Sequence, residues 1–175
     1  MVHSTDHNIG RIIKFLKKNN LYDNTLIVFT SDNGGLSTQR KVAPTSVFPL
    51  RAGKGWLYEG GIRIPQLIKL PNQNHKEVIS EPVVSYDLFP TIINVLNLNS
   101  SNKNIDGIDL SNLFINKEIE REFIFWHFPH YHGSLWKPGS ALRSSDWKLI
   151  EFYEDNRLEL YNLKDDVSET NDLAD

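Results

Sequence analysis

The sequence predicts an α/β domain followed by a small antiparallel sheet with a helix, and two observations carry this prediction. First, an amphipathic helical pattern is followed, after a short turn, by the apolar run 25–30. A strand that is apolar on both faces is typical of a central parallel strand covered by helices. Second, the pattern beyond residue 104 changes to short strands, which predicts an antiparallel sheet.

The first part of the chain contains two predicted helices and two predicted strands. The first helix ends near residues 19–20, because its apolar residues recur at i, i+3, i+4 and i+7 up to that point. After the strand at 25–30, a second short strand is expected at 66–70, between two prolines. Ser85 can cap a second helix. The apolar residues of the two helices are Ile9, Ile12, Ile13 and Leu16, then Leu88, Ile92, Val95 and Leu96.

The last third of the chain contains the strands of the predicted sheet. The patterns at 123–126, 147–152 and 158–161 each predict a strand, and the polar residues 154–157 join the last two as a hairpin. The polar loop 97–104 separates this region from the preceding one. We therefore expect one domain over residues 1–100 and a second over residues 101–175.

Composition excludes several functions. The 175 residues carry a formal charge of only -3, so no basic surface for nucleic acid is expected. The chain has no cysteine, which excludes disulfides, thiolate metal sites and a cysteine nucleophile. No apolar run approaches the roughly 18 residues of a membrane span. Residues 1–11 do not have the pattern of a signal peptide.

Two polar residues follow the apolar strand directly. Asp32 and Asn33 stand at its carboxyl end, where ligands bind in open α/β sheets. Their oxygens suit calcium or magnesium better than zinc, and the glycines at 34–35 allow a close approach to a ligand. The alternative is an ordinary Asp-Asn-Gly turn.

A lysine flanked by glycines is the second candidate. Lys54 stands between Gly53 and Gly55, so its ammonium group is unshielded and can donate to several oxygens of a sulfate or phosphate. The alternative is a solvated surface lysine. Glu59 and Arg63 are spaced to pair with each other or with the backbone, and we expect a structural role for both.

The segment 127–133 is rich in histidine and aromatic residues. It can line a sugar pocket, because imidazoles donate hydrogen bonds and aromatic rings offer flat faces. Alternatively, it is an aromatic loop packed on the sheet, or its three histidines bind a transition metal. The candidate substrate-binding residues are His127, His130, Tyr131 and His132.

These segments, in this order and at this spacing, resemble sulfatases of the arylsulfatase type, in the alkaline-phosphatase superfamily, and are similar to bacterial polysaccharide sulfatases. The most specific match is the long glycine-lysine segment, and the resemblance covers essentially the whole chain. It implies the C-terminal part of an alkaline-phosphatase-like α/β sandwich. The matching segments are residues 6–11, 31–35, 53–65, 86–91, 106–110, 146–150 and 159–163.

The resemblance implies that Asp32 and Asn33 are calcium ligands and that Lys54 contacts the sulfate. The family's nucleophile is a formylglycine made in a Cys/Ser-x-Pro-x-Arg motif, and this chain has no such motif. The family's N-terminal aspartate pair on the metal is also missing. A helical pattern already runs by Ile9 with almost no lead-in, so we interpret Met1 as an internal methionine; the alternative is a compact domain that opens on a helix. The resemblance implies that the formylglycine and the remaining metal ligands lie in an N-terminal half that precedes Met1.

The leading hypothesis is a fragment of a sulfuric ester hydrolase whose parent enzyme removes sulfate from a sulfated carbohydrate. Its expected partners are that substrate and the N-terminal half of the same enzyme. By resemblance, the expected location is periplasmic or extracellular. Two alternatives remain: a catalytically inert truncated chain that only binds metal or sulfated glycan, and a phosphoester hydrolase of the same superfamily.

Overall fold

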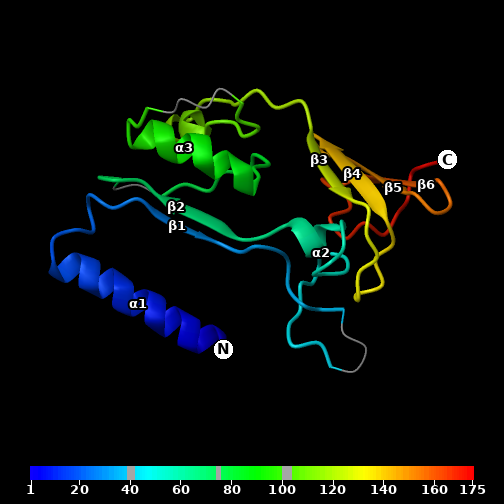
Figure 1. Ribbon diagram of the computed structural model, residues 1–175, viewed down its shortest axis with the longest axis horizontal. Helices are drawn as coiled ribbons and strands as arrows, with labels where there is room; N and C mark the ends of the chain where they lie inside the picture. The colour runs from blue at the N-terminus through cyan, green and yellow to red at the C-terminus, as the bar shows by residue number, and fades with distance from the viewer. Residues whose placement is uncertain (39–41, 74–75, 100–103) are drawn as a thin grey trace. The chain divides into compact units, whose positions relative to one another are not determined.

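The computed structural model describes residues 1–38, 42–73, 76–99 and 104–175 (Figure 1). These residues form two compact units. The first unit contains residues 1–30 and 65–80, and the second contains residues 31–64 and 81–175. The boundary expected between residues 100 and 101 lies outside the described residues and stays a prediction.

The first unit consists of one helix and two strands, and the sequence predicts each of these three elements. Helix α1 spans Val2–Lys18, and strands β1 (Ile27–Thr30) and β2 (Gln66–Lys69) pair with each other (Figure 1). This pairing is antiparallel. The expectation that β1 is a parallel strand is therefore wrong for its pairing with β2. An apolar pattern reports which faces are buried and does not determine the direction of the neighbouring strand.

Lys69 on β2 fixes the turn between α1 and β1. Its Nζ donates to the main-chain oxygens of Tyr22 at 2.7 Å and Thr25 at 3.2 Å, and it lies 4.6 Å from the centre of the Tyr22 ring. These contacts explain why the turn between helix and strand is short and ordered although it contains neither proline nor glycine.

None of the described residues in the first unit is buried. The apolar side chains Ile12, Phe15 and Leu67 are each at least 60% exposed. The amphipathic pattern that predicts α1 therefore leaves an apolar face in contact with solvent. Among the described helices, none is long and apolar enough to cross a membrane.

The helical part of the second unit is organised by Asp87. The predicted helix appears as a 3-10 turn, η1, that leads into α3. Ser85 starts this turn without capping it, and the carboxylate of Asp87 accepts instead from Val84 N and Ile108 N, each at 2.9 Å. The expected cap by Ser85 is not formed, because Ser85 is already the first residue of the helical turn and Val84 is its N-cap residue. The helical elements are α2 (Glu59–Ile62), η1 (Ser85–Asp87), α3 (Leu88–Val95) and η2 (Leu110–Ile115).

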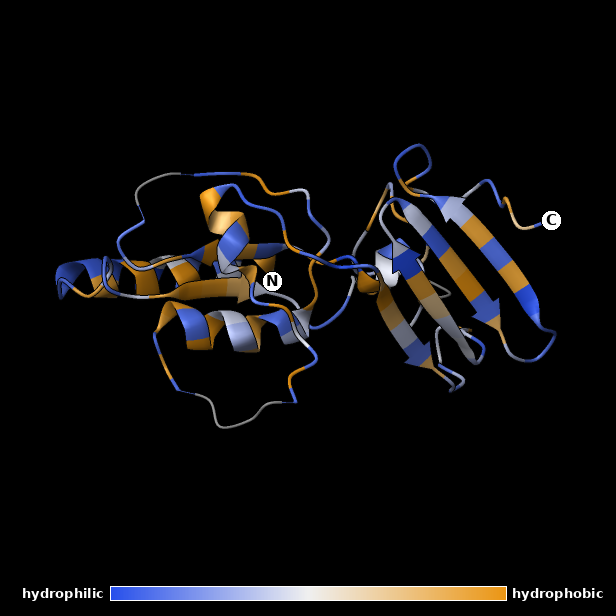
Figure 2. Cartoon of the chain, turned by 90° about the horizontal axis from the view of Figure 1, so that it is seen from above, coloured by the Kyte–Doolittle hydropathy of each residue, from blue (hydrophilic) through white to orange (hydrophobic). Residues whose placement is uncertain are grey.

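The second unit also contains a four-stranded antiparallel sheet in the order β3-β4-β5-β6. Hydrophobic and hydrophilic bands follow one another along its last two strands, β5 and β6 (Figure 2). The three predicted strands and the hairpin are confirmed, but the sequence interpretation missed β4. The strands are β3 (Ile124–Phe128), β4 (Gly139–Ser144), β5 (Trp147–Phe152) and β6 (Arg157–Asn162).

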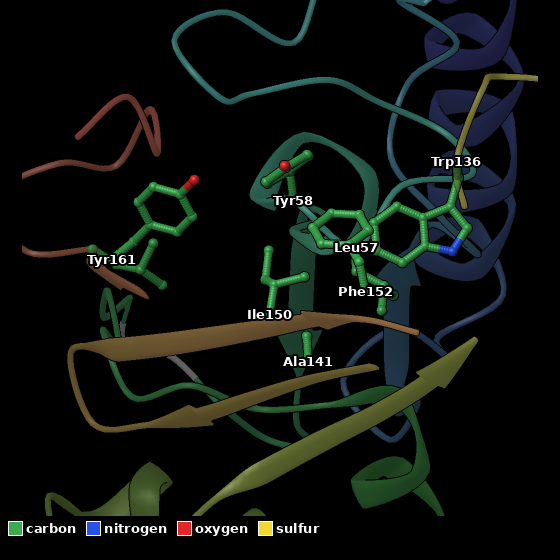
Figure 3. Packing of buried hydrophobic residues seen from close by; sticks show 8 residues of the cluster. Leu57, Tyr58, Trp136, Ala141, Ile150, Phe152 and Tyr161 are labelled. Atoms are coloured by element: carbon green, nitrogen blue, oxygen red, sulfur yellow. The ribbon is translucent and has the colours of Figure 1, made fainter. Parts of the chain in front are cut away.

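The core of the second unit lies between one face of this sheet and the segment that carries Lys54. Figure 3 shows Leu57 and Tyr58 facing side chains from β4, β5 and β6. Trp136 is 1% exposed and lies 5.1 Å from Phe152, centre to centre. Burial of a large apolar side chain contributes about 1.5–3 kcal/mol. The glycine-lysine segment is therefore anchored to the sheet by its own apolar residues.

Candidate active site

Asp32 and Asn33 lie side by side at the start of the second unit. Asn33 Nδ2 donates to Asp32 Oδ2 at 2.6 Å, and Ser31 Oγ donates to the main-chain oxygen of Asn33 at 2.9 Å. The Asp32 side chain is exposed and Asn33 is half-buried. The turn thus presents a carboxylate and an amide group next to each other at the surface of the unit.

Two backbone hydrogen bonds join this turn to the glycine-lysine segment. Gly34 N donates to Gly61 O at 2.8 Å, and Lys54 N donates to Gly35 O at 2.9 Å. Gly34 is buried against the Gly60 carbonyl, so the two backbones approach more closely than a side chain would allow. The structure therefore brings together the two segments that carry the predicted site residues, although they are separated in sequence.

A Gly34→Ala variant is expected to unfold more readily, because an added Cβ overlaps the Gly60 carbonyl oxygen. Overpacking of this kind lowers the free energy of unfolding by about 1–3 kcal/mol, which urea denaturation of the full-length protein measures. Gly133→Ala is the control, since a Cβ there meets nothing within 4 Å. Equal stabilities of the two variants would show that the close approach is not required.

Lys54 lies on a tight turn with its side chain exposed. Positive φ angles at Ala52 (59°) and Gly55 (85°) bend the chain on either side of it. Gly55 is packed against His132, where a Cβ would collide with the ring. The lysine therefore projects from a backbone that packing fixes on both sides, and its ammonium group stays available for an anion.

Of the four residues predicted to bind substrate, His132 lies against this segment. Its Nδ1 is 2.8 Å from Ser134 Oγ and accepts from Ser134 N at 3.2 Å. Trp56 Nε1 donates to Ser134 O at 2.9 Å, which ties the histidine loop to the lysine segment. In the neutral tautomer in which Nδ1 accepts this main-chain N–H, Nε2 carries the proton and can donate.

The other three residues lie elsewhere on the second unit. His127 Nδ1 is 2.8 Å from Tyr153 Oη, and the His130 ring lies 6.0 Å from that of Phe128. Tyr131 Oη donates to Glu154. Within the described ranges no group of three acidic or histidine side chains could hold a metal, so the structure does not support a metal site at the histidines.

Glu154, at the turn between β5 and β6, contacts both Tyr131 and Lys137. Lys137 Nζ lies 2.6 Å from Glu154 Oε2, and the hydrogen bonds from Lys137 and then Tyr131 lower the pKa of Glu154. The hydrogen bond to Glu154 in turn raises the pKa of Tyr131. Tyr131 is therefore oriented by a polar cluster, with 69% of its side chain exposed.

The expected pairing of Glu59 with Arg63 is present, and Glu59 is also part of a buried ionic cluster. Arg63 Nη1 lies 3.6 Å from Glu59 Oε2. Lys148 Nζ lies 3.1 Å from Glu59 Oε1 and 2.8 Å from Glu169 Oε1, and all three of these cluster residues are at most 2% exposed. Burial raises the pKa of Glu169.

The sequence interpretation missed Lys148 and Glu169. Lys148 could have been found, because the alternation along β5 places it on the same buried face as Ile150 and Phe152. No local pattern marks Glu169, which is separated from Glu59 by 110 positions.

The donor chemistry of the Asp32–Asn33 turn fits a hard cation, which takes carboxylate and amide oxygens. Calcium accepts six to eight oxygen ligands in proteins. In the part of the chain that the structure describes, no group of three metal-binding side chains accompanies these two. The turn can therefore contribute to a calcium site but does not complete one.

Comparison with known proteins identifies the family of the chain. The family model described as sulfatase matches residues 1–98, and one described as N-sulphoglucosamine sulphohydrolase, C-terminal, matches residues 52–175. A sulfatase of Formosa agariphila is 32% identical over 98% of this chain and 34% of that protein. Human arylsulfatase A is 34% identical over 84% of this chain and 29% of that protein. The chain spans about a third of the length of these relatives.

Solved structures show the same fold. The crystal structure of Ps i-CgsB in complex with k-i-k-neocarrahexaose has a TM-score of 0.79 at 33% identity, covering 99% of this chain and 37% of that one. The structure of BT4656 in complex with D-glucosamine-2-N,6-O-disulfate has a TM-score of 0.73 at 26% identity, covering 98% and 34%. The predicted fold class is confirmed, and the chain belongs to the sulfatase family.

Proposed function

We propose that the protein carrying this chain hydrolyses sulfate esters of a carbohydrate and that Asp32, Asn33 and Lys54 belong to its active site. The observation that carries this proposal is the pair of backbone hydrogen bonds from Gly34 to Gly61 and from Lys54 to Gly35. Through them, one small region offers oxygens for a cation and an ammonium group for an anion. A site that binds a sulfate ester through a cation needs oxygen ligands for the cation and a positively charged donor for the sulfate oxygens.

In this proposal, each residue acts on the sulfate group. The exposed ammonium group of Lys54 donates to the non-bridging oxygens and stabilises the negative charge that develops during S–O cleavage. Asp32 and Asn33 would hold Ca²⁺ together with ligands from outside this chain, and the cation would supply positive charge to the sulfate group. The Asn33–Asp32 hydrogen bond holds the two side chains next to each other.

The nucleophile of this reaction is proposed to come from outside the chain. Sulfatases use a formylglycine, and residues 1–175 contain neither cysteine nor a Ser-x-Pro-x-Arg motif from which it could form. The family relatives are about three times longer than this chain, given its coverage of 34% and 29%. We therefore assign the formylglycine and the remaining metal ligands to an N-terminal part of the same enzyme. By its similarity to bacterial polysaccharide sulfatases, we propose that the enzyme lies in the periplasm or outside the cell.

The carbohydrate is proposed to contact the histidine loop. His132 is the strongest candidate, because it lies against Gly55, one residue from Lys54, with Nε2 able to donate. His127, His130 and Tyr131 would contact more distant parts of a sugar chain. Two of the similar solved structures are complexes with carbohydrates, a neocarrahexaose and a sulfated glucosamine, which supports a sulfated carbohydrate as substrate.

The test is a substrate profile of the full-length protein with calcium present. Sulfated oligosaccharides and aryl sulfates should be hydrolysed with a kcat/KM at least a hundredfold above that for the matching phosphate monoesters. A preference for phosphate would establish the phosphoester alternative instead. An absence of turnover on both classes, in protein shown to carry formylglycine, would contradict the proposal and favour the inert binding protein.

A further inference from the structure

Glu169 contacts both sides of the segment that carries Lys54. Its main-chain oxygen accepts from Arg51 Nη1 at 2.6 Å, and its carboxylate Oε2 accepts from Glu59 N at 2.7 Å. Arg51 precedes Lys54 by three residues and Glu59 follows it by five. Glu169 itself is 0% exposed and has a positive φ of 51°. A residue near the C-terminal end of the chain therefore spans the lysine turn.

The two bonds act on a turn that is already closed by the backbone. Gly60 N donates to Arg51 O at 2.9 Å, so residues 51–60 form a loop with Lys54 inside it. The Arg51 guanidinium lies 3.9 Å from the centre of the Tyr58 ring and donates to Tyr161 Oη at 2.9 Å. Glu169 thus binds the loop where its two ends meet, and fixing these ends limits the positions that Lys54 can reach.

The charge of Glu169 is balanced within the protein. Its Oε1 lies 2.8 Å from Lys148 Nζ, and Lys148 also approaches Glu59. A buried ion pair is not in itself stabilising relative to apolar residues of similar volume. What an apolar residue could not supply is the acceptor for Glu59 N, and this directional bond is the specific contribution of the carboxylate.

We propose that Glu169 is a positioning residue that holds the Lys54 turn in the geometry needed to bind the sulfate group. This inference rests on the proposed role of Lys54 in anion binding. Glu169 acts through Arg51 and Glu59 and does not touch the substrate. A displacement of about 1 Å in an active site can lower a rate by about a hundredfold, so loss of this contact should be visible in kinetics.

The kinetic test compares Glu169→Leu with Glu169→Gln in the full-length protein. The leucine removes the acceptor for Glu59 N and should lower kcat/KM for a sulfate ester by about a hundredfold. The glutamine keeps an amide oxygen at this position and should stay within about threefold of the wild type, because the acceptor for Glu59 N is preserved. Asp87→Ala is the matched control, since Asp87 is also 0% exposed and ion-paired, to Arg121, but has no contact with the lysine turn.

A second measurement does not depend on activity. Hydrogen–deuterium exchange of the full-length protein should show the amides of residues 59–61 exchanging at least tenfold faster in Glu169→Leu, and unchanged in Asp87→Ala. If Glu169→Leu does not fold, Arg51→Met replaces it, because this variant loses the bond to the Glu169 carbonyl but keeps the side-chain stem.

The outcomes separate this inference from the proposed function. Faster exchange together with reduced kcat/KM supports it. Wild-type exchange at residues 59–61, or unchanged kcat/KM despite faster exchange, would overturn it, as would an equal loss of kcat/KM in Asp87→Ala. If the wild-type protein hydrolyses no sulfate ester, the proposed function fails, and the positioning role of Glu169 at Lys54 fails with it. This holds even if the exchange result shows that Glu169 stabilises residues 59–61.

Discussion

Replacement of Lys54 by alanine in the full-length protein is expected to lower kcat/KM for a sulfate ester by about 10²–10³-fold, the usual effect of losing one group that stabilises developing charge. The side chain is exposed and its backbone is held through Lys54 N and the neighbouring Gly55. Truncation should therefore remove the ammonium group without moving the turn. Steady-state kinetics measures the loss of kcat/KM, and a thermal melt of the same preparation tests whether the fold is unchanged.

The control for this variant is Lys164→Ala, which removes another exposed lysine of the second unit. It should retain wild-type kcat/KM, so that a change in net charge alone is excluded as the cause. The product anion gives a further reading: inhibition by inorganic sulfate should weaken in Lys54→Ala and not in Lys164→Ala. Equal kcat/KM for Lys54→Ala and the wild type would contradict the assignment of Lys54 to the site.

Replacement of Lys148 by alanine is expected to lower the free energy of unfolding by about 3–5 kcal/mol, because removal of one partner leaves buried charge uncompensated. Lys148 is 0% exposed and lies between two carboxylates, Glu59 and Glu169. Arg143 approaches Glu59 only at 3.7 Å and cannot replace Lys148 at Glu169. Urea denaturation of the full-length protein measures the loss.

A double variant distinguishes the charge effect from the loss of packing. Lys148→Met with Glu169→Gln removes one charge of each sign and keeps the volume of both side chains. It should recover a large part of the stability lost in Lys148→Ala. A loss below about 1 kcal/mol in Lys148→Ala, the range of exposed ion pairs, would show that these charges are solvated and that the cluster does not join the lysine segment to the sheet.

Most of the regular structure could be predicted from local patterns. The bounds of β5 agree fully with the prediction, because large apolar side chains dominate it from Trp147 to Phe152. The missed strand β4 begins with Gly139, Ser140 and Ala141, which have little intrinsic preference for strands. They are small because the sheet is tight there: a Cβ on Gly139 would collide with the Glu151 carbonyl.

The candidate site was predicted from its residue types, and its geometry came only from the fold. Asp32 and Lys54 were chosen separately, and the contact that joins their segments uses main-chain atoms of glycines, which carry no side-chain signal. The four residues of the histidine loop looked equivalent in sequence. Only packing against Gly55 distinguishes His132 from the others.

Calcium titration of the full-length protein tests the central claim most directly. Isothermal titration calorimetry on chelator-treated protein should show one calcium site whose affinity falls at least tenfold in Asp32→Ala. The same site should be unchanged in Asp23→Ala, which removes another exposed carboxylate from a turn. Equal calcium affinities of Asp32→Ala and the wild type would contradict the claim that Asp32 and Asn33 hold the cation beside Lys54.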